Sequence, residues 1–213
     1  MTQININLLL LDFFSKNPDV REARNKGLVN RRALAKYIIE KERLNINKKE
    51  ALVTALRRFE LNPEYEDVKD MIKDVKISTK DGISIVYLKK SEEVLKNISK
   101  VINLIDYNKN ETLKFVQGSL SIQLFVDKFN LKKIEDIFSN KNVIKISNNI
   151  SELNLTFPDK ATKTKGQISY LTSELFINGI NIVEFLTGKP EIIIYVNESD
   201  LLKAYETINR LKK

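Results

Sequence analysis

The chain has 213 residues, an ordinary globular composition (42% hydrophobic, 30% charged) and a formal net charge of +8. It contains neither cysteine nor histidine, which excludes disulfides, zinc fingers, thiol nucleophiles and the commonest general base. No stretch is long and apolar enough to span a membrane, and the start lacks a signal-peptide pattern, so we expect a cytoplasmic protein with no membrane partner.

Residues 1–63 show the apolar periodicity of short helices. Pro18 suits a first helical position, and Asn30 is placed to cap a helix that runs to about residue 42. Asn47 is placed to cap a further helix, with Leu52 and Leu56 in its buried stripe. The sequence therefore predicts a small helical module at the N-terminus.

Basic residues concentrate in this module: twelve Lys or Arg stand against six Asp or Glu between residues 19 and 60. The segments GLVNRRALAKYI and KKEALVTALRRF resemble helix-turn-helix segments of archaeal regulators, and this resemblance implies a DNA-binding module with duplex DNA as partner. Such a fold places basic side chains on phosphates and base edges. The residues expected to do this are Arg32, Lys36, Lys49, Thr54, Arg57 and Arg58. The alternative is a solvated basic face.

Residues 64–74 are rich in acidic side chains and predict a linker helix. Glu64, Glu66, Asp67 and Asp70 invite comparison with a cation site, but the run has no loop spacing that would let carboxylate oxygens converge. We therefore predict a solvated linker helix and no metal site.

Two β-type runs, residues 75–78 and 83–88, flank Asp81-Gly82 in the pattern of a hairpin. One interpretation is the wing of a winged helix. The order that follows favours another, because strand, helix, strand, strand, helix and strand alternate over residues 82–148. That order predicts a βαββαβ unit over residues 82–148.

Residues 152–213 repeat the order strand, helix, strand, strand, helix, and then the sequence ends without a fourth strand. We infer that residues 75–79 supply that strand, so that the first unit is inserted within the second. The predicted fold class is α+β: an N-terminal helical, helix-turn-helix-like module followed by two ferredoxin-like βαββαβ units.

The wording G-Q-I … L … N-G-I-N-I, from Gly166 to Ile182, resembles the ACT domain, the amino-acid-sensing module behind aspartokinase, where paired units show a similar insertion. The resemblance implies an amino acid effector bound at the loop after the first strand of the second unit. Asp159 would meet its amine, and the amides of Gly166, Gln167 and Ile168 would meet its carboxylate. Asn181 matches the asparagine of the family pattern. The alternative is a charged loop beside a sheet that binds nothing.

No catalytic or phosphate-binding motif stands out, so we predict no catalytic residues, no cofactor and no enzymatic activity. The main hypothesis is a homodimeric, amino-acid-sensing transcriptional regulator that binds DNA. One alternative is a stand-alone ACT regulatory subunit that binds a biosynthetic enzyme and not DNA. Another is an enzyme that uses lysine and carboxylates.

Overall fold

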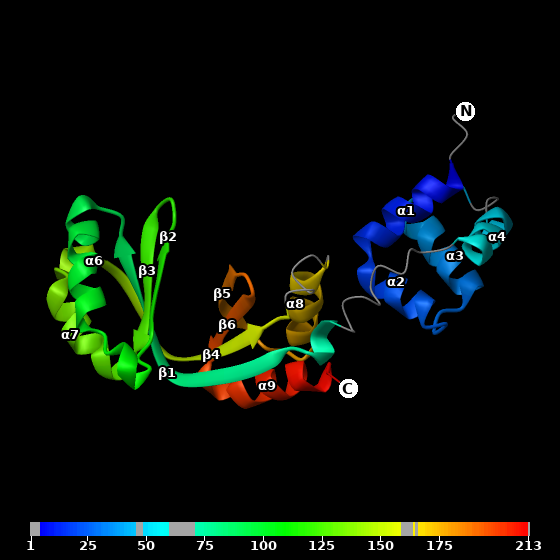
Figure 1. Cartoon of the computed structure of the whole chain (residues 1–213). Coiled ribbons are helices and arrows are strands. Elements are labelled where there is room, and N and C mark those ends of the chain that lie inside the picture. The colour runs from blue at the N-terminus through cyan, green and yellow to red at the C-terminus, as the bar shows by residue number, and fades with distance from the viewer. Residues whose placement is uncertain (1–4, 46–48, 60–70, 159–163, 165, 213) are drawn as a thin grey trace. The chain divides into compact units, whose positions relative to one another are not determined.

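The computed structural model of this protein describes residues 5–45, 49–59, 71–158, 164 and 166–212. The chain divides into two compact units, Met1–Pro63 and Glu64–Lys213 (Figure 1). In the described ranges, no helix has both the length and the apolar character needed to cross a membrane.

In its described residues, the first unit is a bundle of four short helices. Asn30 caps α3 as expected, because its side chain accepts hydrogen bonds from the amides of Arg32 and Ala33. The predicted cap Asn47 lies outside the described residues. Aromatic and aliphatic side chains of all helices but the second are fully enclosed, among them Phe13, Phe14 and Leu56. The helices are α1 (Ile6–Lys16), α2 (Pro18–Asn25), α3 (Arg31–Lys41) and α4 (Lys49–Arg58).

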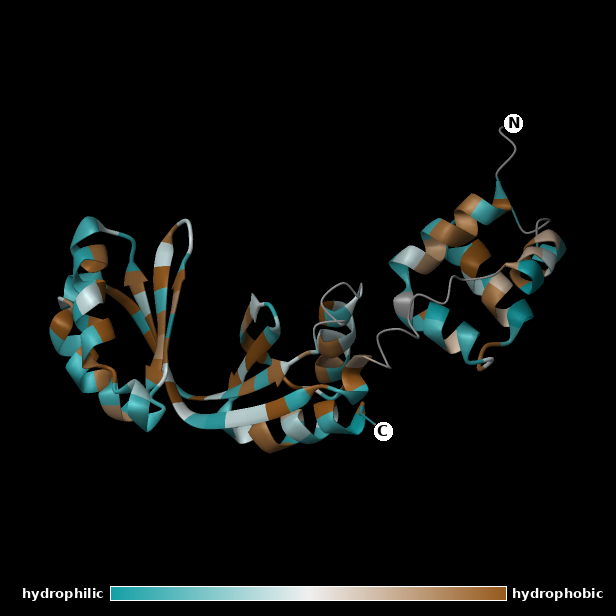
Figure 2. Ribbon diagram, in the orientation of Figure 1, coloured by the Kyte–Doolittle hydropathy of each residue, from teal (hydrophilic) through white to brown (hydrophobic). Residues whose placement is uncertain are grey.

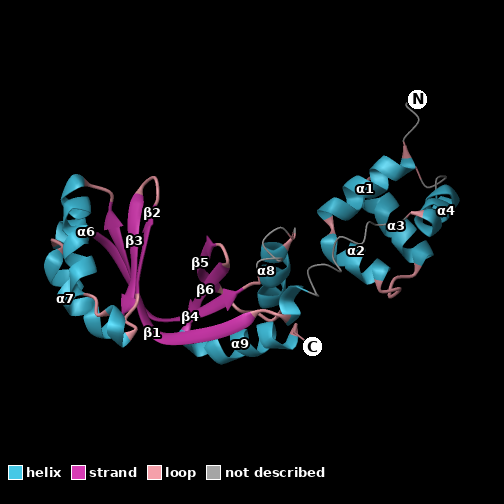
Figure 3. Cartoon of the chain, viewed as in Figure 1, coloured by secondary structure: helices cyan, strands magenta, loops and turns pink. Residues whose placement is uncertain are grey.

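The second unit is built on one six-stranded sheet in the order β2-β3-β1-β4-β6-β5, with every neighbouring pair antiparallel (Figure 3). The strands are β1 (Lys76–Lys89), β2 (Leu113–Gln117), β3 (Ser121–Asp127), β4 (Val143–Thr156), β5 (Ile182–Gly188) and β6 (Glu191–Asn197). The α-helices are α6 (Glu92–Leu104), α7 (Leu131–Ile137), α8 (Gln167–Ile177) and α9 (Leu201–Arg210). Short 3-10 helices cover Tyr107–Lys109, Lys128–Asn130, Asn140–Asn142 and Glu198–Asp200.

The long strands β1 and β4 are each shared by two ferredoxin-like βαββαβ units. In β1, residues 83–89 lie between β3 and β4, while residues 76–80 pair with residues 152–156 of β4. The expected hairpin around Asp81-Gly82 is wrong, and so is the alternative of a DNA-binding wing, because Lys76–Lys89 is one continuous strand. The predicted boundaries at residues 64–74, 82–148 and 152–213 stay a prediction.

Each long strand contains one residue in the left-handed conformation where the two ferredoxin-like units meet. Gly82 has φ +64° in β1, and Asn149 has φ +58° in β4. The pairing register of β1 with β4 shifts between Lys80 and Ile83, where the extra residue is in β1. It shifts again between Ile83 and Ile85 and between Tyr87 and Leu88, where the extra residue is in β4. Bulges bend a strand and increase its twist. Asp81-Gly82 therefore forms part of a bulge and not of a turn. The same sequence suits both structures, because both need a residue that tolerates positive φ.

Two apolar cores lie under the helices, and a third lies between the inner faces of the sheet. Val94 and Val101 of α6 pack on one half, and Leu171 and Leu175 of α8 pack on the other. The third core joins Ile83, Ile85 and Phe125 to Ile150, Ile193 and Tyr195. Successive residues of a strand point to opposite faces, so a strand with a core on each face is buried at consecutive positions, as in residues 192–196 of β6. Figure 2 shows the hydrophobic residues along the strands and on the helices. The result is four layers: helices, sheet, sheet and helices (Figure 1).

Candidate functional site

A pocket of about 220 Å³ lies between the start of α8 and the turn that joins β5 to β6. It is large enough for a small metabolite but smaller than a typical drug-sized site. Its apolar lining is Phe157, Ile168, Pro190 and Ile192, and its polar lining is Gln167, Thr187, Lys189 and Glu191. One cation and one carboxylate therefore border a mainly apolar hollow.

The topology explains why these segments meet. Strands β4 and β5 are both antiparallel to β6, so they run parallel to each other. The last residues of β5 and of β4 therefore lie at the same end of the strands, and the chain leads from β4 into α8 at that end. A β5–β6 turn at this end necessarily faces the start of that helix.

Helix α8 begins next to the pocket with Gly166 in the left-handed conformation, at φ +83°. The amide of Tyr170 donates to the Gly166 carbonyl at 2.9 Å, which closes the first helical turn. The first amides of an α-helix have no acceptor within the helix and attract an anion. Ile168 is 49% exposed on this rim. The start of α8 thus offers donors on one side and apolar surface on the other.

The structure brings only part of the predicted ligand set together. Gln167 and Ile168 line the pocket, and Gly166 directly precedes them. Asn181 does not join them, because it follows the other end of α8, about 16 Å away along an 11-residue helix. Asp159 lies outside the described residues. Sequence reasoning missed Lys189 and Glu191, although the parallel course of β4 and β5 could have pointed to them.

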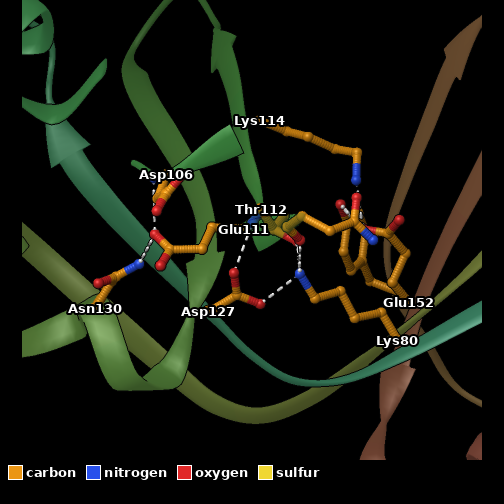
Figure 4. Close-up of polar contacts among 10 residues, drawn as sticks. Lys80, Asp106, Glu111, Thr112, Lys114, Asp127, Asn130 and Glu152 are labelled. Carbon is orange, nitrogen blue, oxygen red and sulfur yellow. Dashed lines mark hydrogen bonds and ion pairs between the residues drawn. The ribbon is translucent and has the colours of Figure 1, made fainter. Parts of the chain in front are cut away.

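The buried carboxylate of Glu152 makes two contacts on the inner face of the bent sheet, and the one with Lys114 joins the two ferredoxin-like units (Figure 4). Lys114 of β2 donates to Glu152 Oε2 of β4 at 2.6 Å, and Tyr195 Oη of β6 donates to the same oxygen at 2.8 Å. Burial, first, and then the neighbouring Glu152 carboxylate raise the pKa of Tyr195 above its ordinary value. The Glu152 side chain is only 8% exposed, so this contact is a buried structural link.

A second charged cluster anchors the segment before β2 (Figure 4). Lys80 Nζ lies 2.8 Å from Asp127 Oδ1, and the amide of Thr112 donates to the other oxygen of that carboxylate. Nearby, the amide of Asp106 and the side-chain amide of Asn130 donate to Glu111; the Asp106 amide is the larger cause of the lowered Glu111 pKa. These carboxylates are held by partners within the fold. Across the described ranges, no three acidic side chains come together to hold a metal ion.

The predicted DNA-contacting residues lie on α3 and α4 of the first unit. Arg57 and Arg58 are exposed, whereas Lys49 is half-buried. Three others have partners on these helices: Arg32 lies 4.0 Å from Glu50, Lys36 lies 3.7 Å from Glu40, and the Thr54 hydroxyl donates to the Glu50 carbonyl. The side chains of Arg32 and Lys36 are nevertheless 73% and 70% exposed, so the exposed cations of this surface lie on both α3 and α4.

Two of the twelve basic residues counted between residues 19 and 60 make contacts within the first unit that stabilise its fold. Arg24 donates to the carbonyls of Leu56 and Phe59 at the end of α4, and its guanidinium lies over the Phe14 and Phe59 rings. Burial lowers its pKa. Lys41 donates to Asn17 and also lies over an aromatic ring. The count of basic residues in the sequence thus overstates the charge available to a partner.

Comparison with known proteins gives a fold relationship. No protein-family model and no curated protein matches the sequence. Among solved structures, aspartate kinase from Clostridium acetobutylicum matches 64% of this chain with a TM-score of 0.54 and 20% identity. The match spans only 34% of that kinase.

Two further structures match over nearly their whole length. The regulatory subunit of aspartate kinase from Thermus flavus has a TM-score of 0.52 and 9% identity, with 64% of this chain and 97% of the subunit covered. A chain from the structure of aspartokinase alpha and beta subunits has a TM-score of 0.51 and 13% identity, with 63% and 95% covered. Over about two thirds of its length, this chain therefore has the fold of aspartokinase regulatory units.

Proposed function

We propose that this protein is a regulatory protein that binds a small amino acid in its ACT-like half and acts on a biosynthetic enzyme. The observation that carries the proposal is the pocket beside α8 in a fold that matches a kinase regulatory subunit over 97% of that subunit. The fold and the pocket together favour sensing over catalysis.

The lining of the pocket supports an amino acid as the ligand. A free amino acid carries a carboxylate and an ammonium group close together, and the pocket borders on Lys189, Glu191 and the amides at the start of α8. The helix start and Lys189 suit the carboxylate, and Glu191 suits the ammonium. Phe157 and Ile192 would face an apolar side chain. In this proposal Glu191 takes the role that the sequence assigned to Asp159, and Asp159 remains a further candidate.

A thermal-shift screen against the common amino acids, one at a time, tests the sensor. A ligand present at 100 times its dissociation constant adds about 2.7 kcal/mol of stability. For a chain of this size, that stabilisation raises the midpoint by roughly 5–10 °C. A screen with no shift for any amino acid would remove the sensing proposal.

The partner is tested separately. Affinity purification of the full chain, with and without the amino acid that binds, should retain a biosynthetic enzyme in one condition more than in the other, because coupled binding requires differential affinity. We also propose a homodimer, which light scattering on the purified chain would establish. A monomer at every concentration would contradict that part of the proposal.

A second candidate function is DNA binding by the first unit, carried by the exposed Arg57 and Arg58 at the end of α4. In this version, the four-helix unit is helix-turn-helix-like, and the ACT-like half controls it in a transcriptional regulator. A duplex should then bind with an affinity that falls steeply with salt, and Arg57→Ala with Arg58→Ala should abolish the binding. The absence of binding even at low salt would leave the enzyme partner as the only target.

A further inference from the structure

The β5–β6 hairpin has two different faces. On the helix side, Thr187 and Ile192 line the pocket. On the inner side, Glu184 and Tyr195 reach the other ferredoxin-like unit, and Leu186 packs against the core between the sheets. The same pair of strands therefore forms a wall of the pocket and a wall of the joint between the units.

Glu184 holds the β5 side of this joint. Tyr87 Oη of β1 donates to Glu184 Oε1 at 2.9 Å, and Gln123 Nε2 of β3 donates to the same oxygen at 3.1 Å. Strand β5 is at the edge of the sheet, separated from β1 by β4 and β6. These bonds exist only because the sheet is bent so that its inner faces meet. Glu184 is three residues before Thr187 on the same strand.

Tyr195 holds the β6 side. Its ring stacks on Phe125 with centroids 4.5 Å apart, and its hydroxyl donates to Glu152. Tyr195 is three residues after Ile192, which lines the pocket. Each strand of the hairpin is therefore tied to the first ferredoxin-like unit within a few residues of the pocket.

We propose that Glu184 is a positioning residue that couples the pocket to the packing of the two ferredoxin-like units. The proposal rests on the proposed function, in that the pocket is taken as the effector site. A ligand that displaces the hairpin must strain or remake the Tyr87–Glu184–Gln123 contacts. Linkage is reciprocal. A substitution in the first ferredoxin-like unit that weakens those contacts must therefore change the position of the hairpin and the affinity of the pocket for its ligand. Signal transfer between the units then runs through β5.

Hydrogen–deuterium exchange on the full chain tests this coupling without a ligand. Tyr87→Phe removes one donor to Glu184 from a residue outside the hairpin. Amides of residues 185–192 should then exchange roughly tenfold faster, the factor expected when one hydrogen bond to a charged group is lost. Tyr107→Phe is the matched control, because Tyr107 is a 59% exposed tyrosine in the same ferredoxin-like unit. It should leave the hairpin unchanged.

Amides of α6 serve as the internal reference, because that helix packs on the other core. Faster exchange in the hairpin but not in α6 supports coupling through Glu184. Equal acceleration in both regions, or none in the hairpin, overturns it.

The ligand arm uses the amino acid that gives the largest thermal shift with the unsubstituted chain. Its dissociation constant should rise severalfold in Tyr87→Phe and stay the same in Tyr107→Phe; equal constants would overturn the coupling. If no amino acid binds at all, the sensing function fails, while the exchange data still decide whether Glu184 positions the hairpin.

Discussion

Phe125 and Tyr195 occupy the same place in the two ferredoxin-like units and stack on each other. Each is the fifth residue of a seven-residue strand, β3 or β6, that leads through a 3-10 turn into a helix. Their ring planes meet at 27° with centroids 4.5 Å apart. The third strands of the two units thus meet face to face, and this contact forms the centre of the core between the sheets.

Removing the Phe125 ring should therefore destabilise the second unit strongly. The side chain is fully buried, and truncation of a buried phenylalanine costs about 3–5 kcal/mol through lost contacts and the cavity left behind. Phe125→Ala should lower the denaturant midpoint measured by circular dichroism. Phe129→Ala is the control, because that ring is 66% exposed, and it should change stability by less than about 0.5 kcal/mol. Similar losses for the two variants would show that the inner core is not packed as described.

Alkaline pH should weaken the joint between the units through Tyr87. Burial, first, and then its bond to Glu184 raise the pKa of Tyr87 from 10.0 to about 12. A raised pKa means that the fold favours the protonated phenol, so its contribution is complete below pH 10 and is lost as the pH rises toward 12. Denaturant unfolding below pH 10 and near pH 12 measures this loss. The free energy of unfolding should fall less between the two pH values in Tyr87→Phe than in the unsubstituted chain. An identical loss in both would contradict the assignment.

Substitution of the two charged pocket residues should lower the affinity for the amino acid, whereas substitution of Asn181 should not. Lys189→Met and Glu191→Gln should each lower the affinity for a bound amino acid at least tenfold, because a hydrogen bond to a charged group contributes roughly 1.5–3 kcal/mol. Asn181→Ala should have little effect, since Asn181 lies beyond the far end of α8. Isothermal titration with the amino acid found in the screen measures all three. Loss of binding in Asn181→Ala alone would move the site to the other end of the helix.

Arg24 should matter for stability and Arg57 should not. Arg24 caps the end of α4 and lies on two aromatic rings, so Arg24→Ala removes bonds to the carbonyls of Leu56 and Phe59. The expected loss is about 1–3 kcal/mol in the unfolding of the first unit. Arg24→Lys should recover little of it, because an ammonium cannot reproduce the planar fork of a guanidinium. Arg57→Ala should unfold like the unsubstituted chain, and a large loss there would place Arg57 within the fold.

Local signals predicted a good part of this architecture. Asn30 caps the helix that follows it, Pro18 is the first residue of α2, and apolar periodicity identified Leu52 and Leu56 as core residues. These features depend on neighbours within a few positions, which sequence reasoning can see. Asp81-Gly82 shows the limit: the pair indicates a positive φ but not whether the chain reverses or bulges, and here β1 continues past the pair with a bulge.

The candidate site was only partly predictable for the same reason. Gln167 and Ile168 directly follow the glycine that starts α8, so the sequence pattern around that glycine included them. Lys189 and Glu191 line the pocket from a turn about twenty residues further along the chain, which that pattern does not cover. The basic count in the first unit included Arg24, whose guanidinium is used by the end of α4. A charge count cannot distinguish a cation held by two carbonyls from one that faces solvent.

The sequence by itself determined the kinds of elements, their order and the α+β class, because hydrophobic period, caps and glycines act over a turn or a strand. Only the tertiary structure decided that the two long strands bend at paired bulges and bring Glu184 to Tyr87 and Tyr195 to Phe125. These contacts join residues many positions apart, and their free energy depends on burial between the facing halves of one bent sheet, which exists only once the whole second unit has folded.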